Sequence, residues 1–433
     1  MRKSGYVATS TVLGMLCLMY MITYIDRVNI STAAGVFRDE LKFSATDYGK
    51  IFAAFGYTYA MFQIVGGWIG DRFGPRLTLG ICGAVWATAT ILTGLVEGFW
   101  SFIALRLLLG FGEGATFPTA TRAMSNWTRA GWRGFAQGIT HSFSRLGNAA
   151  APALVVGLIS VTSWRGSFVV VGLISLAWVI AWVWYFRDNP RDHPGVSAAE
   201  LAVLPAYGTG SRAKADAVPW RLLVPRMMPT TIVYFCYGWT LWLYLSWLPQ
   251  YFLHGHDLNL KNAAWFTTAV GMAGVIGDSV GGIVSDYLYK MTGSLTIARR
   301  NVIVFSLISS LLFLVPVFIF ENVFVLAACL SGAFFCLELT IGPIWSVPMD
   351  IAPKFAGTAS GIMNTGSAIA AIISPIVFGM IIDATGNWEL PFLGSIGLLL
   401  VGAVLTFWIR PERGLTGAAS DAEIGGKPVG ATR

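Results

Sequence analysis

Long apolar stretches separated by short polar segments follow one another along the whole chain. Each stretch approaches the ~20 residues that a helix needs to cross the hydrocarbon core of a bilayer. We expect twelve such helices, over residues 9–33, 47–70, 77–96, 100–124, 136–161, 167–186, 228–252, 262–285, 301–320, 323–349, 357–383 and 390–410. The narrowest separation is the pair Glu321-Asn322, which we interpret as a hinge between two spans. The pattern predicts an all-α membrane protein.

The longest polar segment divides the predicted helices into two sets of six. It covers residues 187–226 and is basic and rich in Ala and Pro. We therefore expect an N-terminal six-helix bundle over residues 1–186, a central loop over 187–226, a C-terminal bundle over 227–410 and a tail over 411–433.

The composition agrees with a membrane protein and excludes a large soluble domain. Hydrophobic residues make up 55% of the 433 positions, and charged residues only 12%. Soluble domains carry roughly 25% charged residues. So few charges cannot cover the surface of a water-soluble protein of this size.

The basic residues predict the orientation of the chain. If both termini lie inside, 21 of the 29 Lys and Arg residues fall in cytoplasmic segments, five in outer loops and three within spans. Cytoplasmic loops of membrane proteins carry such an excess. We therefore expect both termini and the central loop to be cytoplasmic, in a bacterial inner membrane. The same distribution explains the net charge of +7 without a nucleic-acid partner.

The two halves contain matching motifs. Gly67-Trp-Ile-Gly-Asp71 ends the second predicted span, and Gly282-Ile-Val-Ser-Asp286 ends the eighth, 215 residues later. The fifth and eleventh spans open with Gly-x-x-x-Gly-Ile and each contains a Pro at the same later spacing. Chance similarity between Gly-rich apolar segments is the alternative. Two parallel repeats predict a substrate path at their interface, near the middle of the membrane.

The segment from Gly67 to Arg76 resembles the signature loop of the major facilitator superfamily, Gly-x-x-x-Asp-Arg-x-Gly-x-Arg. The resemblance implies a fold of twelve transmembrane helices in two pseudo-symmetric six-helix bundles. At a helix end, the Asp71 carboxylate can pair with Arg72 or Arg76, or with the N-terminus of a neighbouring helix. We interpret these residues as a gating or structural ion-pair site; an ordinary charged turn is the alternative.

Further motifs resemble the anion:cation symporter branch, which includes hexonate, hexuronate, phthalate and sialic-acid transporters. They are Tyr24-Ile-Asp-Arg-Val-Asn-Ile-Ser31, Arg106-Leu-Leu-Leu-Gly-Phe-Gly-Glu-Gly-Ala-Thr-Phe-Pro118, Ser246-Trp-Leu-Pro-Gln-Tyr251, and Ala352-Pro-Lys354 followed by Gly361 and Asn364. The Gly-Pro-x-x-Gly-Gly motif of many drug antiporters is absent from the fifth span. The resemblance implies transport of an organic anion together with a cation.

Ionisable residues inside the predicted spans are the candidates for chemistry, because each costs at least ~2.5–3.5 kcal/mol at a membrane centre and is therefore usually functional. They are Asp26, Arg27, Arg106, Glu113, Arg145, Asp278 and Glu338.

We expect Arg27 to bind the substrate carboxylate, because its planar guanidinium matches a carboxylate with two hydrogen bonds. The alternative is a structural ion pair with Asp26 or Glu113. Arg106 is expected to be a structural partner, of Asp26 in particular. Asp26 and Glu113 are the candidates for proton coupling, since a carboxyl group in a closed apolar cavity takes up a proton more readily. The family resemblance implies proton roles for both.

Arg145 departs from the family pattern. A second cation beside the substrate would suit a dianion or a bulky acid, and the alternative is a salt bridge inside the N-terminal half. Asp278 and Glu338 are each a possible second proton site. Tyr59 and Gln63, one helical turn apart, are candidates for binding the uncharged part of a substrate, and the resemblance implies a substrate-binding amide at Asn364.

The function predicted from these features is proton-coupled symport of an organic anion, a sugar acid or another small carboxylate, by alternating access. The family resemblance leaves sodium open as the alternative coupling ion. An exporter or antiporter of the same superfamily is the first alternative. A membrane-embedded enzyme and a sensor are weaker ones, since we find no nucleophile–base set, metal-binding constellation or large soluble domain. We expect a monomer in contact with lipid, without cofactor or metal.

Overall fold

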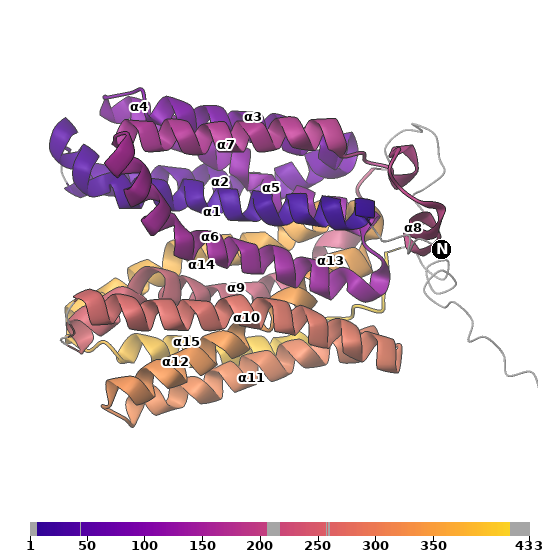
Figure 1. The fold of residues 1–433 in the computed structure, drawn as a ribbon. Helices are drawn as coiled ribbons and strands as arrows, with labels where there is room; N and C mark the ends of the chain where they lie inside the picture. Colours follow the sequence, from indigo (N-terminus) through magenta and orange to yellow (C-terminus); the bar gives the residue numbers. More distant parts are fainter. Residues whose placement is uncertain (1–6, 44, 206–216, 257, 259, 416–433) are drawn as a thin grey trace, which may run out of the picture.

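A computed structural model describes residues 7–43, 45–205, 217–256, 258 and 260–415, which fold into helices arranged as two groups (Figure 1). The N-terminal half consists of α1 (Val7–Leu41), α2 (Ala45–Phe73), α3 (Pro75–Thr93), α4 (Phe99–Gly114), α5 (Thr116–Trp127), α6 (Arg133–Val161) and α7 (Trp164–Tyr185). The C-terminal half consists of α9 (Trp220–Gln250), α10 (Leu260–Thr292), α11 (Val302–Leu314), α12 (Val323–Glu338), α13 (Ile341–Ile351), α14 (Ala356–Thr385) and α15 (Leu390–Leu405). The short helix α8 (Ala198–Val203) lies between them in the chain.

Each predicted span has a helical counterpart, and two spans are broken in the middle. The fourth span is divided into α4 and α5 at Ala115, and the tenth into α12 and α13 at Leu339 and Thr340. Within the described residues, nine helical segments are long and apolar enough to cross a membrane by length and composition alone. The other three spans are α2, the broken α4–α5 and the proline-containing α9, which carry polar or helix-interrupting residues.

Three predicted boundaries need correction. The eighth span was expected to end at residue 285, but α10 continues through Asp286 to Thr292. The seventh span begins at Trp220 rather than 228, because the helix accommodates Pro225 and Pro229 instead of starting after them. The first helix continues to Leu41, beyond the apolar stretch that was expected to end it at residue 33. The hinge at Asn322 is confirmed, since its side-chain oxygen caps α12 by accepting hydrogen bonds from the next turn.

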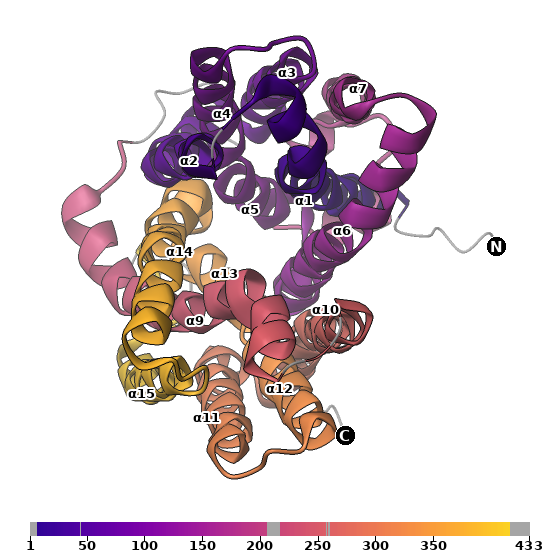
Figure 2. The same ribbon diagram turned by 90° about the vertical axis from the view of Figure 1, so that its left-hand side faces the viewer.

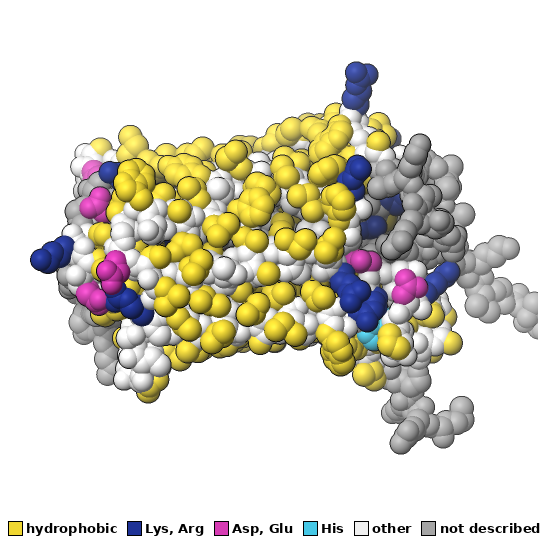
Figure 3. Space-filling model, turned by 90° about the horizontal axis from the view of Figure 1, so that it is seen from above, with side chains coloured by type: hydrophobic (Ala, Val, Ile, Leu, Met, Phe, Trp, Pro, Cys, Tyr) yellow, Lys and Arg dark blue, Asp and Glu magenta, His cyan; other side chains and the backbone are white. Residues whose placement is uncertain are grey.

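The surface carries the pattern expected of a membrane-spanning bundle. Hydrophobic side chains cover its middle, and charged side chains gather toward its two ends (Figure 3). Large apolar side chains such as Met61, Trp184 and Phe305 are exposed on the helices. Burying so much apolar surface in lipid removes the cost of exposing it to water.

One end of the bundle, here called the α8 end, holds the start of α1 and the helix α8 (Figure 1). The carboxylate of Glu200 on α8 accepts hydrogen bonds from the backbone amides of Ala8 and Thr9, and so caps α1. Burial disfavours the ionised form of Glu200, but hydrogen bonds from Ser197 and Thr9 outweigh it and lower its pKa. The central segment is thereby attached to the N-terminal half.

The two halves meet along two pairs of helices: α2 lies against α14, and α6 lies against α10 (Figure 2). The glycines of the repeated motifs make this contact possible. A Cβ atom on Gly67 would collide with the carbonyl oxygen of Gly357, and one on Gly282 with that of Gly134. Small residues allow helix backbones to approach this closely in membranes.

Candidate functional site

The guanidinium of Arg27 on α1 forms an ion pair with Glu113 on α4. Its Nε atom donates to Glu113 Oε2 at 2.6 Å, and the carboxylate side chain is 0% exposed against 12% for Arg27. Four aromatic rings surround the guanidinium, with centroids 4.6–5.3 Å from its central carbon: Tyr24, Phe55, Tyr59 and Phe117. Cation–π contacts of this kind hold an arginine in one orientation in a poorly hydrated site.

Glu113 lies two residues before the break between α4 and α5. Glycines on both sides allow α2 to pack closely there, since a Cβ on Gly110 would collide with the carbonyl oxygen of Phe55 and one on Gly114 would lie 2.7 Å from Cβ of Phe62. The one oxygen that Arg27 does not bind, Oε1, has no hydrogen-bond partner within the described structure. The Glu113 carboxyl group is therefore buried and paired with one cation, and one of its two oxygens lacks a hydrogen bond.

Asp26 points away from this pair. It is buried, and its Oδ2 atom accepts a hydrogen bond from Ser175 on α7 at 3.0 Å. The expected ion pair between Asp26 and Arg106 is not present among the described residues. Arg106 instead lies over the ring of Phe55, 4.9 Å from its centroid. The spacing along α4 gave Arg106 and Glu113 a common face, but it could not show which helix that face meets.

Of the three uncharged candidates, Tyr59 contacts Arg27 directly, and Gln63 and Asn364 are joined to Tyr59 by hydrogen bonds. The Tyr59 ring lies beside the Arg27 guanidinium at 4.6 Å. The Asn364 amide donates to Gln63 Oε1 at 2.7 Å, which joins α14 to α2 across the two halves. Gln63 also donates to the carbonyl oxygen of Tyr59.

Arg145 on α6 binds residues of the other half, and neither expectation for it anticipated this. Its Nη2 atom donates to Tyr237 OH at 3.1 Å and lies 3.2 Å from Glu338, while Nε lies 3.8 Å from Asp278. Tyr237 also donates to Glu338 Oε2 at 2.8 Å. The alternative of a salt bridge inside the N-terminal half is therefore wrong. We call these four residues the Arg145 cluster.

An aromatic layer lies between the Arg27 pair and the Arg145 cluster, and sequence reasoning missed it. Phe117 and His141 both pack against Trp345, with centroids 6.4 and 4.9 Å apart. Trp345 donates through Nε1 to Tyr234 OH at 2.8 Å, and Tyr234 stacks on Tyr237. One signal was available: His141 precedes Arg145 by one turn and shares its face of α6.

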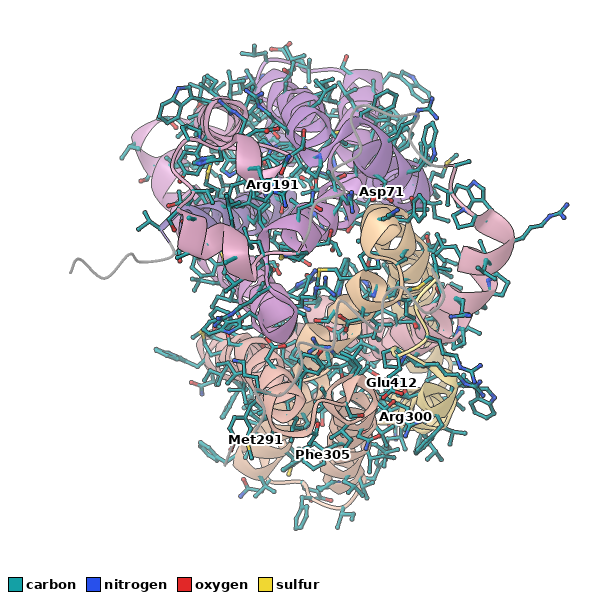
Figure 4. All side chains as sticks on the ribbon, turned by 90° about the vertical axis from the view of Figure 1, so that its right-hand side faces the viewer. Asp71, Arg191, Met291, Arg300, Phe305 and Glu412 are labelled. Atoms are coloured by element: carbon teal, nitrogen blue, oxygen red, sulfur yellow. The ribbon has the colours of Figure 1, made fainter. Side chains whose placement is uncertain are left out.

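At the α8 end, two aspartates cap helices of the opposite half. Asp71 accepts hydrogen bonds from the backbone amides of Gly357 and Thr358 at 2.9 and 2.6 Å, at the start of α14. Figure 4 looks onto the α8 end and shows Asp71 where the two halves meet. Its repeat counterpart Asp286 accepts from the amides of Gly134 and Phe135, at the start of α6.

Among the partners expected for Asp71, the helix N-terminus is confirmed, and neither Arg72 nor Arg76 pairs with it in the described structure. The Arg76 guanidinium donates to the carbonyl oxygen of Val183 near the end of α7. Arg72 lies over the ring of Trp68. The nearest cation to Asp71 is Arg122, with Nε 3.6 Å from Oδ1.

A groove of about 230 Å³ lies at the α8 end, away from these buried charges. It is lined by the start of α1, the end of α5 and α8, including Leu13, Trp127 and Leu204. None of the residues that line it belongs to the Arg27 pair or the Arg145 cluster, so we do not assign the substrate to it.

The sequence and the fold were compared with those of known proteins and protein families. The family model "Major Facilitator Superfamily" matches residues 16–375 and 291–430. The chain is 46% identical over 92% of its length to the probable sulfoacetate transporter SauU of Cupriavidus necator, covering 93% of that protein. It is 31% identical to the hexuronate transporter of Bacillus subtilis, over 94% of this chain and 96% of that one. The solved proton:xylose symporter XylE has a TM-score of 0.74 at 13% identity, over 96% of this chain and 99% of that one.

Proposed function

Because this multi-pass membrane protein belongs to the major facilitator superfamily, and its named relatives are transporters rather than enzymes, we propose that it imports a small organic anion together with a proton. The relatives support the class of substrate, since they include named transporters of sulfoacetate, hexuronate and galactarate or D-glucarate. All of these compounds carry at least one carboxylate.

The Arg27–Glu113 pair is the observation that carries this proposal. Arg27 is a permanent cation inside the membrane, and its guanidinium lies among aromatic rings and pairs with Glu113. Glu113 occupies Nε of Arg27, and the buried Nη2 has no hydrogen-bond partner within the described structure, so a substrate carboxylate could bind there and would compete with Glu113 for the charge of the guanidinium. Protonation of Glu113 removes the charge that competes for Arg27, so that proton and anion bind together.

The direction of opening follows from the contacts between the halves. The described polar contacts between them run from Asp71 and Asp286 at the α8 end as far as Gln63 and Arg145, near the middle of α2 and α6. We infer that this conformation is closed at the α8 end. We assign the α8 end, with both termini, to the cytoplasmic side of a bacterial inner membrane. Rocking of the halves would then release anion and proton into the cytoplasm.

Arg27 is a better primary anchor for the substrate than Arg145 in this conformation. Arg145 already faces two carboxyl groups of its own cluster, whereas Arg27 faces one. For a dianion, Arg145 would be a further cation, on the other side of the aromatic layer from Arg27. We therefore place the substrate carboxylate at Arg27, with Tyr59, Gln63 and Asn364 beside it.

Uptake into proteoliposomes tests the transport proposal. Purified protein should accumulate labelled sulfoacetate, a hexuronate or D-glucarate when the pH outside is lower than inside, and a protonophore should abolish accumulation. Accumulation driven by the opposite gradient would support the exporter or antiporter instead. Failure of all three anions to bind or move under either gradient would refute an organic-anion symporter.

Glu113→Gln tests the coupling step separately. The amide resembles the protonated carboxyl group in size and no longer competes as an anion for Arg27. The variant should exchange substrate between equal pools but fail to concentrate it under a proton gradient. Asp26→Asn is the matched comparison, since Asp26 is equally buried but hydrogen-bonds to Ser175. If Glu113→Gln still concentrates substrate, Glu113 is not an obligatory proton carrier.

A further inference from the structure

The Arg145 cluster contains more acidic groups than the cation in it can neutralise. Asp278 and Glu338 are each 0% exposed, and Arg145 lies between them at 3.8 and 3.2 Å. Glu338 receives hydrogen bonds from Tyr237 and Arg145. Both oxygens of Asp278 lack a hydrogen-bond partner within the described structure. A buried carboxylate without a donor is very unfavourable, whereas its neutral form is much less so.

Among the described residues, we find no other permanent charge beside the cluster that would balance it. The titratable and charged groups that form it or lie nearest to it are Tyr20 and Tyr24 on α1, His141 and Arg145 on α6, Tyr234 and Tyr237 on α9, Asp278 on α10 and Glu338 on α12. The Nδ1 atom of His141 donates to the carbonyl oxygen of Gln137, one turn earlier on α6, at 2.9 Å. With both carboxyl groups ionised, the cluster would hold one unpaired negative charge.

The Arg145 cluster lies at the interface between the two halves, so its net charge can depend on whether the halves are together or apart. Arg145 comes from the N-terminal half, and the other three residues come from the C-terminal half. One turn closer to the α8 end, Ser142 Oγ lies 2.7 Å from Ser279 Oγ across the same interface. When α6 and α10 separate at the α8 end, water reaches the carboxyl groups and both can ionise. When the helices close, the cluster is buried again.

We propose that Asp278 and Glu338 together form a second proton-binding site, and that the proton they share is a condition for closing the two halves at the α8 end. The proton is bound in the conformation described here and is released when the interface opens. This proposal does not rest on substrate binding at Arg27, and it assigns a coupling role to the C-terminal half. Protonation of the pair makes the cluster neutral: one guanidinium, one carboxylate and one carboxylic acid.

A disulfide across the interface tests the proposal without any substrate. Ser142→Cys with Ser279→Cys should form a disulfide in the closed conformation, because the two oxygen atoms are 2.7 Å apart. The control pair is Asn29→Cys with Ser167→Cys, whose side chains touch at 3.1 Å inside the N-terminal half. Dividing the yield of the first pair by that of the second removes the pH dependence of thiol oxidation itself.

The expected ratio falls as the pH rises, by up to about tenfold per pH unit for linkage to one proton. In Asp278→Asn the ratio should be high and independent of pH, because one carboxylate then matches one guanidinium. Glu338→Gln should behave in the same way, and it replaces Asp278→Asn in the experiment if that variant does not fold. In Arg145→Gln the fall should move to lower pH, since two protons are then needed for closure.

The His141→Gln variant distinguishes titration of the carboxyl pair from titration of the His141 imidazole. The pH dependence should survive in this variant, because the proposed proton lies on the carboxyl pair. A ratio that is flat in the parent protein, or that keeps its slope when either carboxyl group is neutralised, would overturn the proposal. Loss of the slope in His141→Gln would assign the titration to His141 instead.

Discussion

Arg27→Lys is the most direct test of where the substrate binds. Lysine keeps the positive charge but replaces a planar fork of donors by a single ammonium group. The Arg27 side chain is held by Glu113 at 2.6 Å and by rings at 4.6–5.3 Å, so a lysine in the same cage can still pair with one carboxylate oxygen. The substitution therefore removes one charge-assisted hydrogen bond from the bound anion while conserving the charge.

The size of the effect follows from that single hydrogen bond. Hydrogen bonds to charged groups contribute about 1.5–3 kcal/mol. Each 1.4 kcal/mol changes Kd tenfold, so the Kd for the anion should rise roughly 10- to 150-fold. Calorimetry, or the shift of the melting temperature with added anion, measures this on purified protein. Ligand at 100 times its Kd should add about 2.7 kcal/mol of stability to the parent protein.

Arg106→Lys is the matched control for this measurement. Arg106 is also a buried arginine on an aromatic ring, that of Phe55, but we do not place it at the substrate. Its substitution should change Kd by no more than about twofold, because we place no substrate contact at Arg106. A normal Kd in Arg27→Lys would remove Arg27 from the site, whereas equal losses in both variants would point to a general effect on the N-terminal half.

Three further predictions concern the ends of the bundle. Asp71→Asn should weaken closure of the α8 end by about 0.3–1 kcal/mol, the usual contribution of a charge at a helix N-terminus, and so increase alkylation of a cysteine at buried Ser360; unchanged alkylation would contradict this. Because the pKa of Glu200 is lowered in the folded protein, its contribution to stability is present above its ordinary value of 4.5 and is lost as the pH falls through the folded pKa. The melting temperature of the parent should therefore fall more steeply in acid than that of Glu200→Gln. An impermeant thiol reagent added outside intact cells should label a cysteine at Asn387 but not at Val203; the reverse would invert the proposed orientation.

The repeated motifs made the fold and the contacts at the α8 end predictable from sequence. Gly67 and Gly357 were conspicuous because both stand in a spacing that recurs in the other half. The structure gives the physical reason, which is that these glycines bring the backbones of α2 and α14 together. For Asp71, the N-terminus of a neighbouring helix was one of three partners expected from sequence, beside Arg72 and Arg76, and only the structure decides between them.

The partner of each buried charge was harder to predict. Helical spacing shows which residues share a face, but not which helix that face meets. Arg145 could thus be identified as unusual, while its contact with Glu338 depended on how α6 crosses the C-terminal half. The breaks at Ala115 and after Glu338 were missed for a related reason: both lie in apolar sequence, so hydropathy continues through them.

Those two breaks place the acidic residues of the halves in comparable positions with different partners. Glu113 precedes the break in the fourth span and pairs with Arg27 of its own half. Glu338 precedes the break in the tenth span and pairs with Arg145 of the opposite half. A charge pair within one rigid half keeps its geometry as the halves rock, so it can respond to substrate. A pair between halves must change when they separate, so it can respond to conformation. With both kinds of pair, one protein would link a proton to the binding of the anion at Glu113 and a second proton to the movement of the halves at Asp278 and Glu338.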